Sequence, residues 1–228
     1  MHTNNQTLQN SKDAIKHFDL YLFVNPIGLK CYHSEQEVLR YIESIADNKN
    51  IKIHFRFLTF HNFNTVSFYM RRMDLPVNDL QLRNQVYQTI YDASLAYKAA
   101  LMQGKKRGRN FLLLLQKELT VNLALYSDQL LKKIAKGANL DVEMFFEDKD
   151  SDFVKSSYDA DQRIGQEMNI KQTPSLVIFG NDNQQFGILL EDIINFERLE
   201  EAFNHSDLKL TQSNNILPVS KNYLQILK

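Results

Sequence analysis

The segment Asp19-Leu-Tyr-Leu-Phe-Val-Asn-Pro-Ile-Gly-Leu-Lys-Cys31 fixes the beginning of the fold of this 228-residue chain. From Phe18 to Val24 the residues are almost all apolar or aromatic, which is typical of a strand covered on both faces. Asn25 and Pro26 end this strand. The chain then enters a Gly-x-x-Cys motif at residues 28–31. We therefore expect a buried strand that leads directly into a thiol-bearing segment.

The Gly-x-x-Cys motif stands where a dithiol oxidoreductase carries Cys-x-x-Cys. The first cysteine of such a motif lies at a helix N-terminus, where the dipole and free backbone N–H groups lower its pKa and make it the attacking thiolate. Gly28 has no side chain for this role. Cys31 takes the place of the second cysteine, which resolves a mixed disulfide. The sequence thus predicts a redox scaffold that lacks its nucleophile.

Composition limits the possible functions. The chain carries 27 basic and 27 acidic side chains, and this balance gives no electrostatic reason to expect nucleic acid or an acidic membrane as partner. Its single cysteine excludes an internal disulfide and a cysteine-based zinc cluster. No signal peptide and no apolar run of about 18 residues is visible. We expect a cytoplasmic protein with a protein or small molecule as partner.

The start of the first helix allows two interpretations. Ser34 and Glu37 match a capping box, which would begin the helix late and leave Cys31 in a loop. The alternative begins the helix near Gly28. In either case Val38, Ile42 and Ile45 follow along one apolar face, at positions taken from the sequence.

Further elements follow along the chain. Residues 51–57 alternate between apolar and basic and predict a strand, which completes a βαβ unit. From about residue 80 to 165 the pattern is helical, with one apolar stripe from Val86 to Leu101 and another from Leu119 to Ile134. Strands at 175–179 and 185–190, around a turn at 180–183, predict a hairpin. A last amphipathic helix carries Ile193, Phe196, Leu199 and Phe203.

This order, together with three local signals, resembles the DsbA-like branch of the thioredoxin superfamily. The signals are the Gly-x-x-Cys of residues 28–31, the helix of residues 90–100, and the segment of residues 164–179 with its Thr-Pro-Ser. In such folds this last segment places a cis-proline beside the redox site. Within the branch, the chain is similar to the YjbH/SpxH family of Firmicutes over about residues 18–205.

The resemblance implies an α/β thioredoxin fold with a DsbA-like helical insertion. The expected organisation is an N-terminal tail at 1–17, a domain at 18–205 and a C-terminal tail at 206–228. Within the domain, residues 18–75 and 165–205 form the thioredoxin parts and about 76–164 the insertion.

The resemblance also implies a non-enzymatic adaptor for regulated proteolysis in the stress response. Members of this family bind the transcription regulator Spx and present it to the ClpXP protease. The site residues would be Gly28 and Cys31 of a degenerate redox motif and Thr173 and Pro174 of a cis-proline peptide-binding loop. In this loop Thr173 would offer its backbone N–H and C=O to an extended peptide. No catalytic residue, cofactor or metal is expected, and ClpXP would be an indirect partner.

Several side chains have a structural interpretation beside a functional one. Cys31 is a small buried apolar residue or a sensor thiol, and Pro174 an ordinary or a cis proline. His33 is a solvated residue at the helix start or a group that shifts the pKa of Cys31. His54 and His61 show no metal-ligand spacing. The basic run at 105–109 is a solvated loop or a contact for an acidic partner. The aromatic residues at 60–70 are core or an interaction patch.

Two other functions compete with the adaptor. The first is an enzyme of the same fold, either a thiol-dependent oxidoreductase that uses Cys31 or a glutathione-dependent isomerase or transferase of the kappa-like kind. Ser34 or Cys31 would then hold the glutathione thiol, although both lie too late for the first position of the motif. The second is a peptide-binding chaperone without a dedicated client.

Overall fold

The computed structural model describes residues 15–180, 186–205 and 216–218. Most of the two predicted tails and residues 181–183 of the predicted turn lie outside these residues. Where the tails are described, both contain a strand. Strand β1 (Lys16–Val24) begins two residues before the expected boundary, and β5 (Ile216–Pro218) lies within the expected C-terminal tail.

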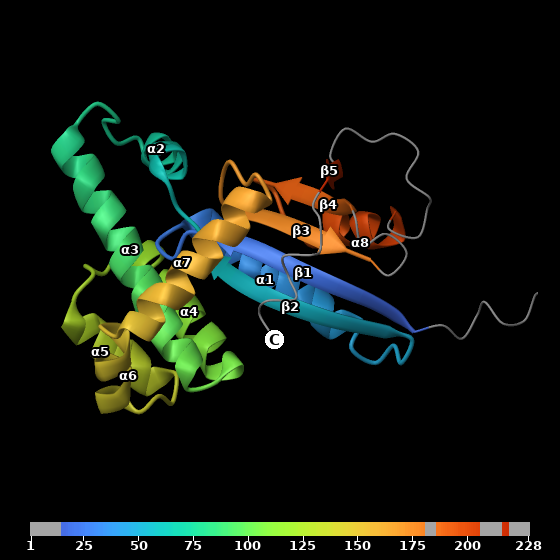
Figure 1. The fold of residues 1–228 in the computed structure, drawn as a ribbon, viewed down its shortest axis with the longest axis horizontal. Helices are drawn as coiled ribbons and strands as arrows, with labels where there is room; N and C mark the ends of the chain where they lie inside the picture. The colour runs from blue at the N-terminus through green and yellow to red at the C-terminus, as the bar shows by residue number, and fades with distance from the viewer. Residues whose placement is uncertain (1–14, 181–185, 206–215, 219–228) are drawn as a thin grey trace, which may run out of the picture.

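The described strands form one mixed sheet in the order β2-β1-β3-β4-β5 (Figure 1). Strand β1 pairs in parallel with β2 (Ile51–Thr59) and antiparallel with β3 (Ser175–Phe179), which pairs in turn with β4 (Phe186–Glu191). Every residue of β3 is buried, as expected for a strand with neighbours on both sides. Phe23 lies opposite Ser175, so the end of β1 meets the start of β3.

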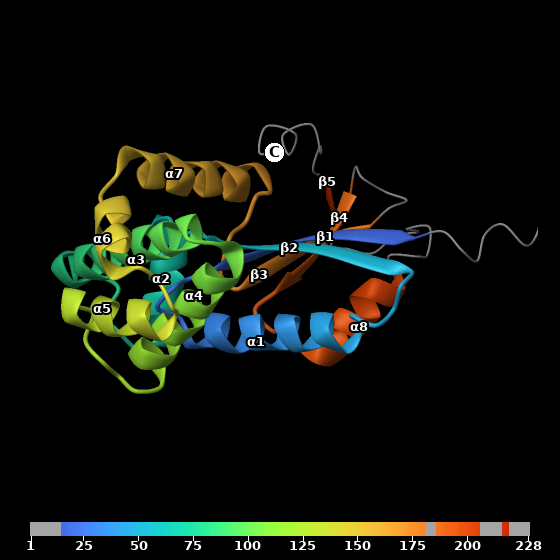
Figure 2. The same cartoon turned by 90° about the horizontal axis from the view of Figure 1, so that it is seen from below.

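Helices cover both faces of the sheet (Figure 2). Helices α1 (Leu29–Ser44) and α8 (Phe196–His205) lie on one face, and α7 (Asp152–Glu167) lies on the other. The predicted βαβ and ββα units are therefore confirmed. Alternate side chains of β1 pack on opposite faces of the sheet. Leu22 packs with α1 and α8, and Phe23 packs with Phe60 and α7.

The remaining helices form a bundle at one end of the sheet (Figure 1). They are α2 (Phe63–Arg72), α3 (Leu80–Met102), α4 (Lys105–Thr120), α5 (Asp128–Gly137) and α6 (Val142–Lys149). The bundle has its own apolar core, which includes Ala93, Phe111 and Leu131. The fold is thus a thioredoxin fold with a DsbA-like helical insertion.

The predicted apolar stripe from Leu119 to Ile134 does not lie on one helix. Helix α4 ends at Thr120, and Leu123 adopts a left-handed φ of 52° with its side chain 77% exposed. Helix α5 then begins after Ser127, whose side chain accepts a hydrogen bond from the Leu130 N–H. The spacing of apolar residues continued across this break by coincidence, so the prediction of a single stripe was wrong.

No helix of the described residues is long and apolar enough to span a membrane.

Candidate functional site

The site begins at the N-terminus of α1, which follows directly from β1. Gly28 is the N-cap residue, with an extended backbone and no side-chain cap, and the helix starts at Leu29. The prediction that this helix begins late, with Ser34 as its cap, is therefore wrong. Ser34 is buried inside the helix, and the Glu37 carboxylate instead accepts a hydrogen bond from the Phe196 N–H at the start of α8, 3.0 Å away.

A tight turn brings the end of β1 against Cys31. The Asn25 side-chain oxygen accepts a hydrogen bond from the Ile27 N–H, and the Asn25 C=O accepts one from the Gly28 N–H, both at 3.0 Å. This turn directs the Asn25 N–H to the Cys31 sulfur, at 3.2 Å. Cys31 is thereby held in place as the third residue of α1.

The Cys31 thiol is buried, with 2% of its surface exposed. Burial raises its pKa to about 12, although hydrogen bonds from the Asn25 N–H and the Thr173 side chain act in the opposite direction. A thiol with such a pKa holds almost no thiolate at neutral pH, and the thiolate is the form that attacks disulfides. The burial and the raised pKa of Cys31 therefore favour a small packed residue over a sensor thiol.

The structure brings together all four residues predicted for the site. The Thr173–Pro174 peptide bond is cis, and Thr173 contacts Cys31 through its side chain. Gly28, Cys31 and Thr173 line one pocket of about 210 Å³, completed by Asn25, Leu29, Lys30, Thr65, Tyr69, Arg72 and Met73. Small-molecule sites usually span about 300–1,000 Å³. The volume of this pocket lies below that range.

Arg72, at the end of α2, donates a hydrogen bond to the Thr173 C=O, for which the sequence predicted no partner within the chain. Its Nη1 donates a hydrogen bond to the Thr173 C=O at 2.6 Å, and its Nη2 pairs with the Asp192 carboxylate at 2.5 Å. The expectation that Thr173 offers its backbone N–H and C=O to a peptide stays a prediction, and the C=O already accepts one hydrogen bond from Arg72. Because a carbonyl oxygen has two lone pairs, a peptide N–H that pairs with it would share this acceptor with Arg72.

Asp192 closes the other side of the site, just after β4. Its carboxylate accepts hydrogen bonds from Lys30, at 2.7 Å, and from Arg72, and these two cations hold its pKa below the usual range. Its own N–H donates to the Pro174 C=O at 3.1 Å. Helices α1 and α2 and the segment after β4 thus meet at one carboxylate. No sequence signal links residues that lie more than 100 positions apart.

Glu35, a second residue that sequence analysis missed, lies one helical turn after Cys31. It is fully buried, and burial raises the pKa of its carboxyl well above the usual value. Gln116 of α4 donates to one oxygen at 2.6 Å, while the other oxygen has no hydrogen-bond partner among the described residues. Its place on the apolar face with Cys31 and Val38 was a signal that the sequence offered.

The other candidate side chains lie away from this pocket. His33 and His54 are exposed, whereas His61 is buried, and burial lowers its pKa to about 4. Within the described ranges, no three His, Cys, Asp or Glu side chains are grouped so as to hold a metal ion. The basic run at 105–109 forms the first turn of α4 and not a loop.

The aromatic residues at 60–70 divide between core and surface. Phe60 and Met70 are buried, whereas Phe63 and Phe68 on α2 are exposed. Arg83 lies over the Phe63 ring, with its guanidinium carbon 4.2 Å from the ring centroid. The core interpretation therefore holds for Phe60 and Met70, and an interaction patch at Phe63 and Phe68 stays a prediction.

Comparison with known proteins agrees with the fold. A family model described as thioredoxin matches residues 21–201. Among solved structures, a probable DsbA oxidoreductase from Streptomyces coelicolor superposes with a TM-score of 0.58 at 12% identity, over 87% of this chain and 93% of that one. At this identity the likeness bears on the fold alone.

Two relatives in sequence are both named ClpXP adapter protein SpxH. The protein from Staphylococcus saprophyticus is 36% identical over 100 residues, which are 44% of this chain and 38% of that protein. The protein from Bacillus subtilis is 28% identical over 202 residues, which are 82% of this chain and 66% of that protein. The resemblance to SpxH proteins is thus confirmed, and the chain matches only part of the length of each.

Proposed function

The chain belongs to the thioredoxin family, and from this premise we propose that it is a non-enzymatic adaptor in the cytoplasm, which binds Spx and promotes its degradation by the ClpXP protease. Its sequence relatives named SpxH support this assignment. The observation that carries the proposal is the state of Cys31. A pocket beside a cis-proline is retained, but its only thiol is buried and has a pKa of about 12.

This combination favours binding over chemistry. A thioredoxin-type pocket holds an extended polypeptide through backbone pairing and side-chain pockets, and neither of these requires a thiolate. A disulfide oxidoreductase, by contrast, needs an accessible thiol of low pKa. With Gly28 at the first position of the motif and a protonated thiol at the second, contact with a client ends in release and not in a covalent intermediate.

The test is binding of Spx by calorimetry, followed by degradation of Spx by ClpXP, for the wild-type chain and Cys31→Ala. We expect both proteins to bind Spx at a defined stoichiometry, with affinities that differ by less than the tenfold that corresponds to about 1.4 kcal/mol. Both should accelerate degradation. Thermal melting of Cys31→Ala controls for folding, because the substitution leaves a small void in the core.

Three results would contradict the proposal. Absence of Spx binding by the wild-type chain would exclude the adaptor role. Turnover of a disulfide substrate by the wild type that disappears in Cys31→Ala would favour the oxidoreductase instead. Binding of unfolded proteins with no preference for Spx would indicate a general chaperone.

A further inference from the structure

Strand β2 leaves one edge of the sheet unpaired among the described strands, because it pairs only with β1. The backbone shows which residues face outward. The Phe57 C=O accepts a hydrogen bond from the Tyr97 hydroxyl at 3.2 Å, and the Thr59 C=O accepts one from the Gln162 side chain at 2.8 Å. Alternate residues of a strand direct their backbone groups to the same side. The backbone N–H and C=O groups of Ile53 and Phe55 therefore also point away from β1.

At Ile53 and Phe55 this edge is open within the described part of the chain, with no backbone hydrogen bond outside the β1–β2 pair. Helices α3 and α7 supply the partners of Phe57 and Thr59, so the open part begins where the helical insertion ends. Such an edge is a template on which an extended segment of another protein can add as a strand.

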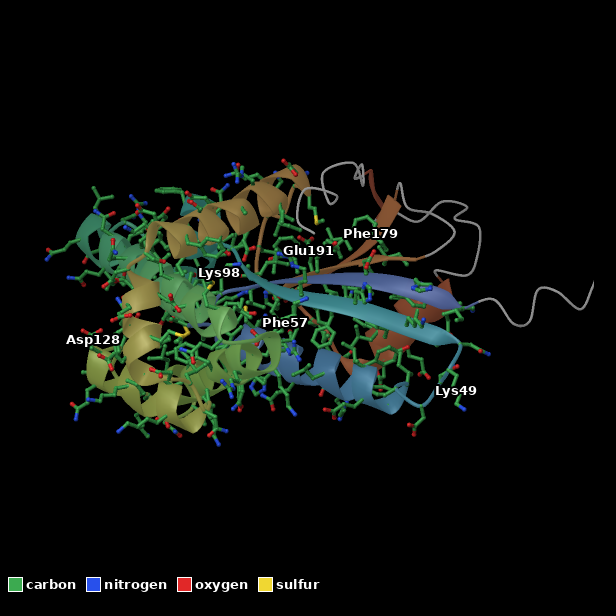
Figure 3. The ribbon with its side chains drawn as sticks, turned by 60° about the horizontal axis from the view of Figure 1, so that its bottom comes forward. Lys49, Phe57, Lys98, Asp128, Phe179 and Glu191 are labelled. Carbon is green, nitrogen blue, oxygen red and sulfur yellow. The ribbon has the colours of Figure 1, made fainter. Side chains whose placement is uncertain are left out.

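A basic pocket of about 300 Å³ lies beside this edge. Its charged lining is entirely cationic and consists of Arg56, Lys98, Lys105 and Arg109. Lys98 is neutralised by Asp161, whereas Lys105 and Arg109 have no ion pair within the described residues. Figure 3 shows Lys98 and Phe57 where β2 meets the insertion helices. The pocket therefore carries a surplus of positive charge next to open backbone groups.

The N-terminus of α4 adds to this surplus. Its N-cap residue, Gly104, makes no side-chain cap, and its first turn holds no acidic residue. The free N–H groups at a helix N-terminus carry partial positive charge and favour anions. In α4 the first turn instead carries the cations Lys105, Lys106 and Arg107. These cations are repelled by the partial positive charge of the helix N-terminus, and a bound carboxylate would offset this repulsion.

Stacking fixes one cation at the strand itself. The Arg109 guanidinium carbon lies 4.6 Å from the centroid of the Phe55 ring, which orients the group over β2. From β2, the Arg56 guanidinium, 40% exposed, lies 3.8 Å from Asp161 and lines the same pocket. Two arginines thus flank the open edge, in a geometry suited to carboxylates.

We propose that the open edge of β2 and the basic pocket beside it form a docking surface for an acidic, extended segment of the client protein. The inference rests on the proposed adaptor function, because it names the surface that holds the client. Charge complementarity requires carboxylate side chains, and the open backbone groups require an extended polypeptide. Nucleic acid would use the cations but not the strand edge.

The test compares Spx binding by the wild type and by two variants with the same change in charge. Arg56→Glu/Arg109→Glu reverses the charge of the two arginines that line the pocket. Lys132→Glu/Lys136→Glu reverses the charge of two exposed lysines on α5 and serves as the matched control. We expect affinity for Spx to fall at least tenfold in the first variant and to stay unchanged in the second. Thermal melting verifies that both fold, and Arg56→Gln/Arg109→Gln provides a milder change.

Hydrogen exchange tests the strand edge separately. In the Spx complex the amides of Ile53 and Phe55 should gain protection, whereas those of α5 should not. Equal affinity of the wild type and the pocket variants would overturn the docking surface and leave the adaptor function intact. Reduced affinity without protection at Ile53 and Phe55 would overturn strand addition. Absence of Spx binding by the wild type would instead refute the adaptor function.

Discussion

Gly28 differs from a reactive cysteine by very few atoms, and its neighbours must shift by a few tenths of an ångström to admit them. Its φ of −103° is open to any residue. A Cβ added there would lie 3.3 Å from the Cys31 sulfur and 3.3 Å from the Asn25 Cβ, contacts that are tight but not prohibitive. The loss of the dithiol motif is therefore local, and the scaffold around it is kept.

This geometry predicts that Gly28→Cys forms a disulfide with Cys31 on incubation with oxidised glutathione. The new thiol would lie at the helix N-terminus, where a lowered pKa lets it attack oxidised glutathione. The Cys31 thiol then has to displace glutathione from the mixed disulfide, a slow step because burial raises its pKa. Titration of free thiols in the denatured protein should fall from two to none, while Gly28→Ser keeps its one thiol. Two thiols that persist after oxidation would show that the turn at Asn25 holds the positions too far apart.

Glu35 predicts a dependence of stability on pH. Its pKa in the folded chain is raised by burial above the value of about 4.3 that it has when unfolded. The folded state thus holds the proton to higher pH, and the free energy of unfolding falls as pH rises through the folded pKa, by at most about 1.4 kcal/mol per pH unit. Glu35→Gln keeps the acceptor for Gln116 and should remove this slope.

The measurement is urea denaturation of the wild type and Glu35→Gln at several pH values. Glu43→Gln, at an exposed position of the same helix, is the control and should retain the wild-type slope. Identical pH profiles for the wild type and Glu35→Gln would mean that the carboxyl is not the group that titrates.

At this scale the sequence predicted the residues whose positions depend on the local backbone. Gly28, Cys31, Thr173 and Pro174 stand in short motifs, and each motif reflects the backbone around it. Arg72 reaches a carbonyl 101 positions away, and nothing near it in the chain marks this contact.

At the scale of elements, α2 acts as a support for the cis-proline loop. Arg72 lies in its last turn and joins the Thr173 C=O to Asp192. We predict that Arg72→Met lowers the free energy of unfolding by about 1.5–3 kcal/mol, the usual contribution of hydrogen bonds to charged groups. Urea denaturation measures this loss, and Arg72→Lys, which keeps the charge, should recover part of it. Equal stability of all three proteins would contradict this supporting role.

Element boundaries were the least predictable feature. Ser34 and Glu37 have the spacing of a capping box, but the turn at Asn25 starts the helix at Leu29 and places Ser34 in its interior. Apolar spacing likewise continued across the loop between α4 and α5. In both cases a local pattern was satisfied, and tertiary contacts selected another structure.

For the whole molecule, the order of elements was predictable because hydrophobic periodicity distinguishes strands from helices over long segments. The boundaries of the insertion at about 76 and 164 stay a prediction; α7 (Asp152–Glu167) crosses the second of them. What joins the insertion to the sheet was not visible in the sequence. Lys98 on α3 pairs with Asp161 on α7, and Arg56 on β2 approaches the same carboxylate.

This buried pair predicts how the two parts depend on each other. Both side chains are almost fully buried, at 5% and 1% exposure. Removal of Lys98 leaves the buried Asp161 carboxylate with only the Arg56 guanidinium, 3.8 Å away, so Lys98→Met should cost up to about 3–5 kcal/mol of unfolding free energy. Lys98→Met/Asp161→Leu removes both charges and should recover most of this loss, because apolar replacement of a whole buried pair is often neutral. Urea denaturation of both variants measures the difference. A double variant as unstable as the single one would mean that this pair, and not merely its charge balance, holds the insertion to the sheet.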